Sequence, residues 1–441
     1  MQKLFKKNSI AIGDRIKIKA RGLEVEGELM PKTEVSADNV IILKLANGYN
    51  IGIAHDNALL LSKISGGSEG IEFPKAEAGV KPGLPKVTLI YTGGTIGSKI
   101  DYKTGGVYML IKPEELLYEV PELSDIANIE VKQLFSIASE DMTSFEWAAI
   151  AREVKSAFDR GSSGVVVTMG TDIMHYTASA LAFMLCDLNG PVVVTGAQRS
   201  SDRGSSDAFF NLIASVTIAA HSDIAEVGIC MHSSSSDERC SFIRGTRARK
   251  MHTSRRDAFR PVNDRPIAYV ERSLKITYNN DYNKTIGEID QPVSAKTNFE
   301  RKVALIKYHP NSDPEVLEHY IKKDYKGIII EGTGLGHVSV SQPNKNATPW
   351  VGAIKRAVDN GIIVGMTSQC LYGRVSKNVY RNLRIINSLG VIYCEDMTPE
   401  TAYVKLAWLL GNYNAEECKR LLDSSIAREI KKRSRYDEFL L

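Results

Sequence analysis

Hydroxyl and carboxylate side chains follow glycine turns in this sequence, and a lysine that could act with them lies further along. Thr95 comes directly after a glycine pair, and Thr171 and Asp172 follow Gly170. Lys250 lies further along, in a basic segment. A threonine hydroxyl becomes a nucleophile when a base removes its proton, and a lysine can be that base when burial or a nearby charge makes it neutral. Asp172 would orient such a lysine, so these residues together predict hydroxyl-nucleophile catalysis.

Buried strands are expected to position these groups. Residues 87–91 and 164–168 are continuous β-favouring runs, and each ends close to a glycine turn. Because ligands of open α/β sheets bind beyond the carboxyl ends of the strands, Thr95 and Thr171 would lie at such an edge. Further strands are predicted at 129–135, 190–196 and 226–231, and helices at 144–160, 177–188 and 207–221. This alternation is typical of a mostly parallel sheet covered on both faces.

The remaining chain divides by its patterning. Residues 1–70 alternate polar and apolar positions and contain the turn Asn47-Gly48, which predicts a small antiparallel β-barrel of the SH3 or OB type. Residues 71–85 form a linker containing Pro and Gly. The first α/β lobe spans 86–275, a polar connection spans 276–300, and the α/β pattern returns over 301–441. The barrel could bind protein or RNA, or be a structural appendage.

Composition limits the class of protein. The chain has 441 residues, 43% hydrophobic and 24% charged, with a formal net charge of +4. We find no apolar run of about 18 residues and no secretory signal, and we expect a cytoplasmic chain without membrane association. The 6 cysteines have no metal-ligand spacing with histidine, which favours reduced thiols and no metal site.

Several motifs together resemble the type I and II L-asparaginase family. Thr92-Gly93-Gly94-Thr95-Ile96 and Gly170-Thr171-Asp172 are similar to the two signatures of that family, in the same order. Ser139-Glu140-Asp141-Met142 resembles its substrate-carboxylate loop. Lys250 resembles its catalytic lysine, and Tyr108 falls where the family has the tyrosine of a mobile flap. The resemblance covers about residues 85–435.

The resemblance implies a role for each residue. Thr95 or Thr171 would attack the side-chain carboxamide, and the sequence leaves the choice between them open. Asp172 and Lys250 would complete the relay that activates the nucleophile and later the deacylating water. Backbone N–H groups near the glycine turns or at Thr171 would stabilise the oxyanion. The remaining assignments are flap closure by Tyr108, α-carboxylate binding by Ser139, and α-ammonium binding by Asp172 and Glu140, with Gly94 and Gly170 in the turns.

The barrel and linker ahead of an asparaginase-like core resemble GatD, an archaeal family of glutamyl-tRNA(Gln) amidotransferase subunits. This implies glutamine hydrolysis that supplies ammonia to a GatE-type partner, which converts Glu-tRNA(Gln) to Gln-tRNA(Gln) with ATP and Mg. No cofactor is expected in this chain, and it lacks a GxxxxGK[ST] motif. A homodimer within a heterotetramer is expected. The alternatives are a stand-alone L-asparaginase or glutaminase and a catalytically idle RNA- or protein-binding scaffold.

Structural explanations compete at individual positions. Thr171 and Asp172 could cap a helix, Ser139 could be a turn residue, and Lys250, flanked by arginines, could belong to a solvated or RNA-facing loop. The preference between glutamine and asparagine is also open. It depends on pocket depth to about one methylene, worth only ~1–3 kcal/mol.

Overall fold

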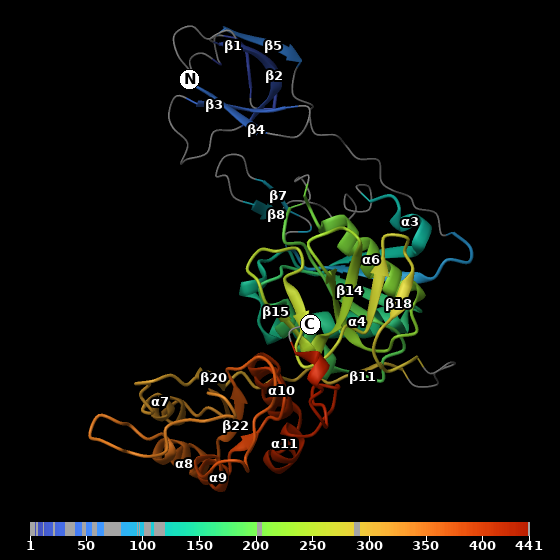
Figure 1. Ribbon diagram of the computed structural model, residues 1–441. Coiled ribbons are helices and arrows are strands. Elements are labelled where there is room, and N and C mark those ends of the chain that lie inside the picture. Colours follow the sequence, from blue (N-terminus) through green and yellow to red (C-terminus); the bar gives the residue numbers. More distant parts are fainter. Residues whose placement is uncertain are drawn as a thin grey trace.

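The computed structural model has an N-terminal sheet followed by two α/β lobes (Figure 1). It describes residues 5, 8–11, 13–20, 23–30, 40–45, 50–54, 60–65, 81–94, 96, 98–100, 107–109, 120–200, 205–285 and 292–439. Thr95 and part of the predicted linker lie outside the described residues.

The N-terminal unit is antiparallel throughout its described strands, as the alternating pattern predicts. Its spatial order is β4-β3-β2-β1-β5. The bounds are β1 Arg15–Ala20, β2 Leu23–Met30, β3 Val40–Lys44, β4 Asn50–Ala54 and β5 Leu60–Ser65. Ile16, Ile18 and Leu43 are buried in a small core of its own, because period-two patterning turns every second side chain inward. Lys44 pairs with Asn50, which confirms the predicted β3–β4 hairpin.

The first lobe is built on a sheet with the order β18-β17-β14-β13-β12-β10-β6-β9 in the described chain. The bounds are β6 Lys86–Tyr91, β9 Asn128–Gln133, β10 Gly164–Thr168, β12 Val192–Thr195, β13 Val227–His232, β14 Arg239–Arg244, β17 Ala268–Glu271 and β18 Ile276–Tyr278. Pairing is parallel from β9 to β13 and antiparallel from β13 to β18. The five predicted parallel strands are therefore present.

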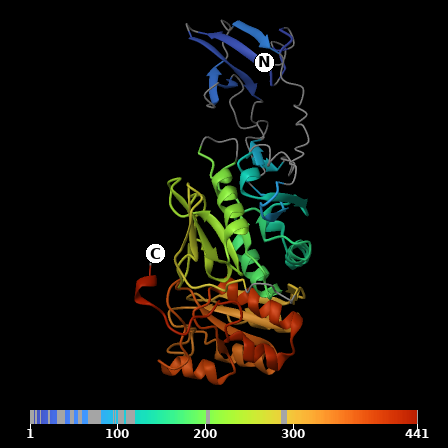
Figure 2. The same cartoon turned by 90° about the vertical axis from the view of Figure 1, so that its right-hand side faces the viewer.

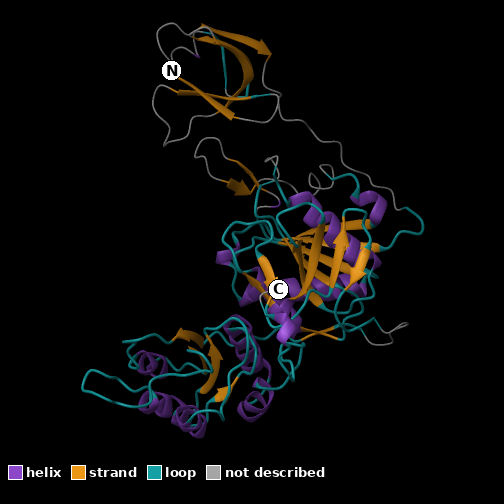
Figure 3. Ribbon diagram, in the orientation of Figure 1, coloured by secondary structure: helices purple, strands orange, loops and turns teal. Residues whose placement is uncertain are grey.

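Helices cover both faces of the parallel half (Figure 3). Helices α4 Ser144–Asp159 and α5 Met174–Met184 contribute to one core, and α3 Leu123–Ile126 and α6 Ala208–His221 to the other. Val165 and Val167 of β10 face the first core, whereas Val166 between them faces the second. A continuous valine run is stable here because both faces of the strand are buried.

Two features of this lobe differ from the sequence prediction. Helix α5 begins at Met174 and gives way at Leu185 to strand β11 Leu185–Cys186, so it begins and ends earlier than the predicted 177–188. Strands β14, β17 and β18 were not predicted. Strand β18 lies inside the range 276–300 that we expected to be a connection, and it extends the first sheet instead. Short antiparallel strands with polar exposed positions carry only a weak periodic signal.

The second lobe has a smaller parallel sheet, ordered β20-β21-β22-β23 among the described residues. Its strands are β20 Val303–Lys307, β21 Gly327–Gly332, β22 Ile363–Ser368 and β23 Ile392–Tyr393, and its helices are α7 Val316–Lys322, α8 Val351–Asp359, α9 Arg381–Ser388, α10 Pro399–Asn412 and α11 Ala415–Leu422. The two lobes lie against each other (Figure 2). Trp408 of α10 stacks on Phe183 of α5, with ring centroids 5.7 Å apart, so they share a core.

Candidate active site

The site begins where two neighbouring parallel strands end together. Strand β6 pairs with β10 in the register Tyr91 to Thr168, so the segments that follow them leave the sheet side by side. Thr92 links the two segments, because its backbone nitrogen and its Oγ1 both donate hydrogen bonds to the Thr168 carbonyl oxygen, at 3.1 and 2.9 Å. The carboxyl-end edge predicted for these groups is therefore present.

Glycines let three loops touch at this edge. Gly93 and Gly94 have φ values of +113° and +88°, a region that favours glycine. A Cβ on Gly94 would overlap the backbone nitrogen of Gly170. A Cβ on Gly170 would lie 2.8 Å from the Cβ of Ser139. The loops after β6 and β10 are thus packed backbone to backbone, and the Ser139 side chain packs against Gly170.

Lys250 reaches this edge from a separate hairpin. It ends β15 Ala248–Lys250, which pairs with β16 Phe259–Pro261. Its Nζ donates to Thr171 Oγ1 at 2.8 Å and lies 2.7 Å from Asp172 Oδ1. The Lys250 side chain is 10% exposed and that of Asp172 67% exposed, so the lysine is held inside while the carboxylate faces solvent. Thr171 is itself buried.

The contacts decide between the competing explanations of these residues. The N-cap position of α5 is Ile173, without a side-chain capping bond, so neither Thr171 nor Asp172 is the capping residue. The Lys250 side chain is largely enclosed and paired with Asp172, so it is not a solvated lysine, although the residues that follow it, 251–255, are exposed. The arginines around it are also paired with carboxylates: Arg247 with Asp396 at 3.0 Å, Arg249 with Glu400 at 2.8 Å, Arg255 with Asp257 at 2.8 Å and Arg256 with Asp237 at 2.6 Å.

Of the other predicted site residues, Ser139 lies at the site, whereas for Tyr108 the structure describes only its strand. Ser139 is buried in the 3-10 turn η2 Ser139–Asp141 and donates to Glu140 Oε2 at 3.3 Å. Its contact with Gly170 puts it at the site. Tyr108 belongs to β8 Val107–Met109, whose register pairs it with Lys99 of β7 Ser98–Ile100, and its side chain lies outside the described part of the structure.

Two further residues border the site. A Cβ on Gly196, after β12, would lie 3.2 Å from Thr171 Cγ2, so the absence of a side chain at this glycine leaves room for the threonine methyl. His175 lies in the first turn of α5, four residues after Thr171 in the sequence, and is buried. Burial, with the charges of Arg249 and Lys250, lowers the pKa of His175 to about 4, so its ring is neutral at pH 7.

The described residues contain no group of three or more His, Cys, Asp or Glu side chains placed to hold a metal ion. No described helix has both the length and the apolar character needed to cross a membrane. At the site, Lys250 Nζ is in hydrogen-bond contact with the Thr171 hydroxyl and the Asp172 carboxylate.

Sequence families match the chain in three segments. Residues 10–64 match the GatD N-terminal domain, residues 86–282 match Asparaginase, N-terminal, and residues 302–422 match the Glutaminase/Asparaginase C-terminal domain. The GatD-type glutamyl-tRNA(Gln) amidotransferase subunit from Pyrococcus abyssi is 48% identical, covering 100% of this chain and 99% of the relative. The chain belongs to the GatD family of glutamyl-tRNA(Gln) amidotransferase subunits.

Other relatives agree with membership in the GatD family. The corresponding glutamyl-tRNA(Gln) amidotransferase subunit from Methanopyrus kandleri is 46% identical over 97% of this chain and 93% of its own length. Among solved structures, the thermostable L-asparaginase from Thermococcus kodakarensis matches with a TM-score of 0.69 and 28% identity, covering 79% of this chain and 100% of its own. L-asparaginase I from Vibrio cholerae has a TM-score of 0.67 and 28% identity, covering 79% and 99%. The asparaginase-like two-lobed fold is confirmed.

Proposed function

We propose that this chain is the glutaminase subunit of a tRNA-dependent amidotransferase. It hydrolyses the side-chain amide of glutamine and supplies the ammonia for conversion of Glu-tRNA(Gln) to Gln-tRNA(Gln). The observation that carries the proposal is the contact of Lys250 Nζ with both Thr171 Oγ1 and Asp172 Oδ1, in a chain whose N-terminal segment matches the GatD N-terminal domain. The match at residues 10–64 favours this function over a stand-alone asparaginase.

The proposed reaction has two stages. A threonine oxygen bonds to the side-chain carbonyl carbon of glutamine while its proton passes to Lys250 in its neutral form. The carbon–nitrogen bond then breaks, and the nitrogen takes a proton from the Lys250 ammonium and leaves as ammonia. Water attacks the resulting ester, its proton again passes to Lys250, and a proton returns to the threonine oxygen as glutamate leaves. Asp172 holds the lysine in position throughout.

The attacking hydroxyl is that of Thr171 or Thr95. Thr171 touches Lys250, whereas Thr95 follows in the sequence directly after Gly94, the glycine that packs on Gly170. Mass spectrometry of peptides from enzyme quenched during turnover separates these assignments, because the glutamyl ester stays on the peptide that contains the nucleophile. In this proposal Tyr108 covers the substrate, Ser139 binds its α-carboxylate, and Asp172 and Glu140 bind its α-ammonium.

The proposal extends to the assembly. A GatE-type partner would receive the ammonia and would use ATP and Mg, so this chain needs no cofactor of its own. A homodimer within a heterotetramer and a cytoplasmic location complete the prediction. Analytical ultracentrifugation of the chain alone and with its partner measures the oligomeric state.

Ammonia release from glutamine and from asparagine, with and without partner and charged tRNA, tests the function. We expect Thr171→Ala and Lys250→Ala each to lower the rate by orders of magnitude with unchanged circular dichroism. Lys355→Ala is a matched control, because Lys355 also lies 2.7 Å from an aspartate, Asp359, in an exposed pair on α8. Wild-type rates in the Thr171 and Lys250 variants would contradict the mechanism. Full turnover unchanged by partner and tRNA would favour the stand-alone enzyme.

A further inference from the structure

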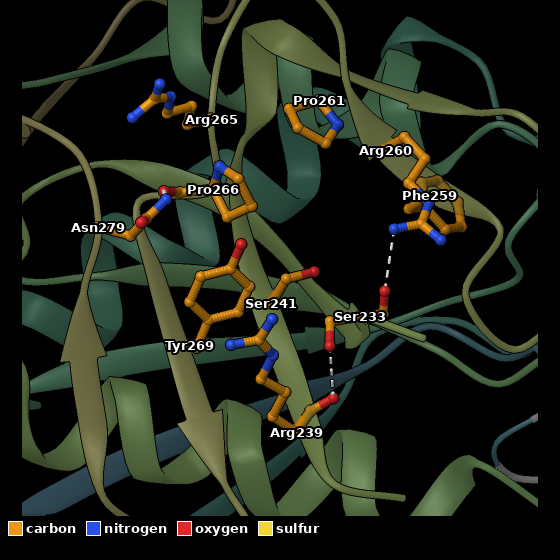
Figure 4. Close-up of a pocket in the computed structure, with 10 residues that line it drawn as sticks. All are labelled: Ser233, Arg239, Ser241, Phe259, Arg260, Pro261, Arg265, Pro266, Tyr269 and Asn279. Atoms are coloured by element: carbon orange, nitrogen blue, oxygen red, sulfur yellow. Dashed lines mark hydrogen bonds between the residues drawn. The ribbon is translucent and has the colours of Figure 1, made fainter. Parts of the chain in front are cut away.

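A second concave site lies behind the hairpin that carries Lys250. Its volume is about 400 Å³, within the range of ligand pockets, which is about 300–1,000 Å³. We call it the arginine pocket, and Figure 4 shows its lining. The lining residues that matter for its chemistry are Ser233, Arg239, Ser241, Phe259, Arg260 and Tyr269.

The alternation of β14 and β17 creates this pocket. Cys240, Phe242 and Val270 face the apolar core under α6. Arg239, Ser241 and Tyr269 alternate with these residues along the strands, so they face the other side of the sheet, where they line the pocket. Polar side chains on that face leave a hollow that water or a polar ligand can fill.

The charge of the lining is of one sign. The pocket contains arginines and hydroxyl groups, and its lining includes no aspartate or glutamate. Arg260 is held in place, since it donates to the Ser233 carbonyl oxygen at 2.9 Å and to Asp257 at 2.6 Å. Arg239 is exposed, and within the described chain no carboxylate lies within ion-pair distance of it. An anion would supply the missing counter-charge.

The arginine pocket also offers a planar surface for stacking, formed by Arg239 and Tyr269. The Arg239 guanidinium carbon lies 4.0 Å from the centroid of the Tyr269 ring, so the two planar groups form a stack at the pocket wall. Aromatic rings and arginine planes are the surfaces on which nucleic-acid bases stack. Fixed positive charge next to a stacking surface suits a ligand that has both a phosphate and a base.

We propose that the arginine pocket binds a nucleotide, with the base against the Arg239–Tyr269 stack and the phosphate beside Arg239 and Arg260. The nucleotide is either one unit of an RNA strand or a free nucleotide. Phe259, in the pocket lining, pairs with Lys250 in the β15–β16 ladder, so the bound nucleotide contacts the hairpin that holds that lysine. The inference stands apart from the proposed function, because binding here requires no glutamine hydrolysis.

Binding to the full chain without glutamine tests the proposal. The probes are AMP, ribose 5-phosphate and a short fluorescent single-stranded oligoadenylate, measured by calorimetry and fluorescence anisotropy. We expect AMP to bind about tenfold more tightly than ribose 5-phosphate, which lacks the base. Arg239→Gln should weaken AMP binding by about tenfold or more. If the same substitution also weakens oligoadenylate binding, an RNA strand is the source. The slope of log K against log salt concentration should then become shallower by about 0.7, the value for one phosphate contact. AMP binding alone identifies a free nucleotide.

Arg272→Gln is the matched control. Arg272 is also exposed and lies over an aromatic ring, Phe210 of α6, at 5.9 Å, but it does not line the pocket. The Arg272→Gln variant should bind AMP and oligoadenylate as the wild type does. Thermal melting checks that both variants are folded. Equal losses in the two variants, equal affinities for AMP and ribose 5-phosphate, or no binding of any probe by the wild type would each overturn the proposal.

Discussion

Lys250 Nζ and Thr171 Oγ1 are 2.8 Å apart, although 79 residues separate them in the sequence. Thr171 follows a central parallel strand, whereas Lys250 belongs to a hairpin that the chain forms after it has crossed to the antiparallel end of the sheet. Their contact joins two independent loops, so the proposed catalysis should depend on the chemistry of the lysine and on the packing of those loops.

Lys250→Arg tests proton transfer separately from charge. Arginine keeps a positive group near Asp172 but does not lose its proton in proteins, so it cannot act as a base. We expect ammonia release to fall by about 10²–10⁴-fold, the contribution of a general acid–base group. Steady-state kinetics with glutamine measures this loss in kcat. If Lys250→Arg were as active as the wild type, the lysine would act only as a fixed charge.

Gly94→Ala tests the packing of the two glycine turns. Gly94 has a φ of +88°, and a Cβ there would overlap the Gly170 backbone. Gly161 has a similar φ of +82° but open space around its Cα, so Gly161→Ala isolates the cost of the backbone conformation alone, about 1 kcal/mol. We expect Gly94→Ala to slow ammonia release. It should also lower the free energy of unfolding by more than Gly161→Ala does. Equal effects in urea unfolding and ammonia release would show that the close approach is unimportant.

A buried ion pair should hold the chain beyond α11 to the second lobe. Lys405 of α10 lies 2.6 Å from Glu429, and both side chains are 0% exposed. Glu429→Ala would leave an uncompensated buried ammonium, which costs about 3–5 kcal/mol of unfolding free energy. Asp359→Ala, which breaks the exposed pair with Lys355, should cost at most about 1 kcal/mol. Denaturant unfolding compares them. If Lys405→Met/Glu429→Leu stays as unstable as Glu429→Ala, the charge explanation is wrong.

His175 should make stability depend on pH below neutrality. Its pKa is lowered from 6.5 to about 4 in the folded chain, chiefly by burial. Between these values the unfolded chain binds more protons than the folded chain, so unfolding free energy falls as the pH falls from 6.5 towards 4. The loss is at most about 3 kcal/mol. Replacing the ring with an amide, in His175→Gln, should flatten this part of the curve, whereas His309→Gln, at an exposed position, should not. An unchanged slope in His175→Gln would exclude His175 as the source.

Much of the first lobe could be predicted because its signals are local. The valine runs at β10 and β12 are strands in any environment that buries both faces, and the capping box of Thr143 and Glu146 marks the start of α4 within four residues. The predicted helix 207–221 corresponds to α6 for the same reason. The glycine turns could also be predicted from the sequence, since few residues other than glycine tolerate the positive φ values of Gly93 and Gly94.

The tertiary structure alone decided which of these signals meet. Local sequence did not show that β14 returns antiparallel to β13, that β17 and β18 extend the same sheet, or that this leaves Arg239 and Tyr269 facing a pocket. It also allowed Lys250 to be either a solvated lysine or the partner of Thr171. Periodicity reports only which face of an element is apolar, whereas the side chains that meet across loops depend on strand order and on contacts between residues far apart in the chain.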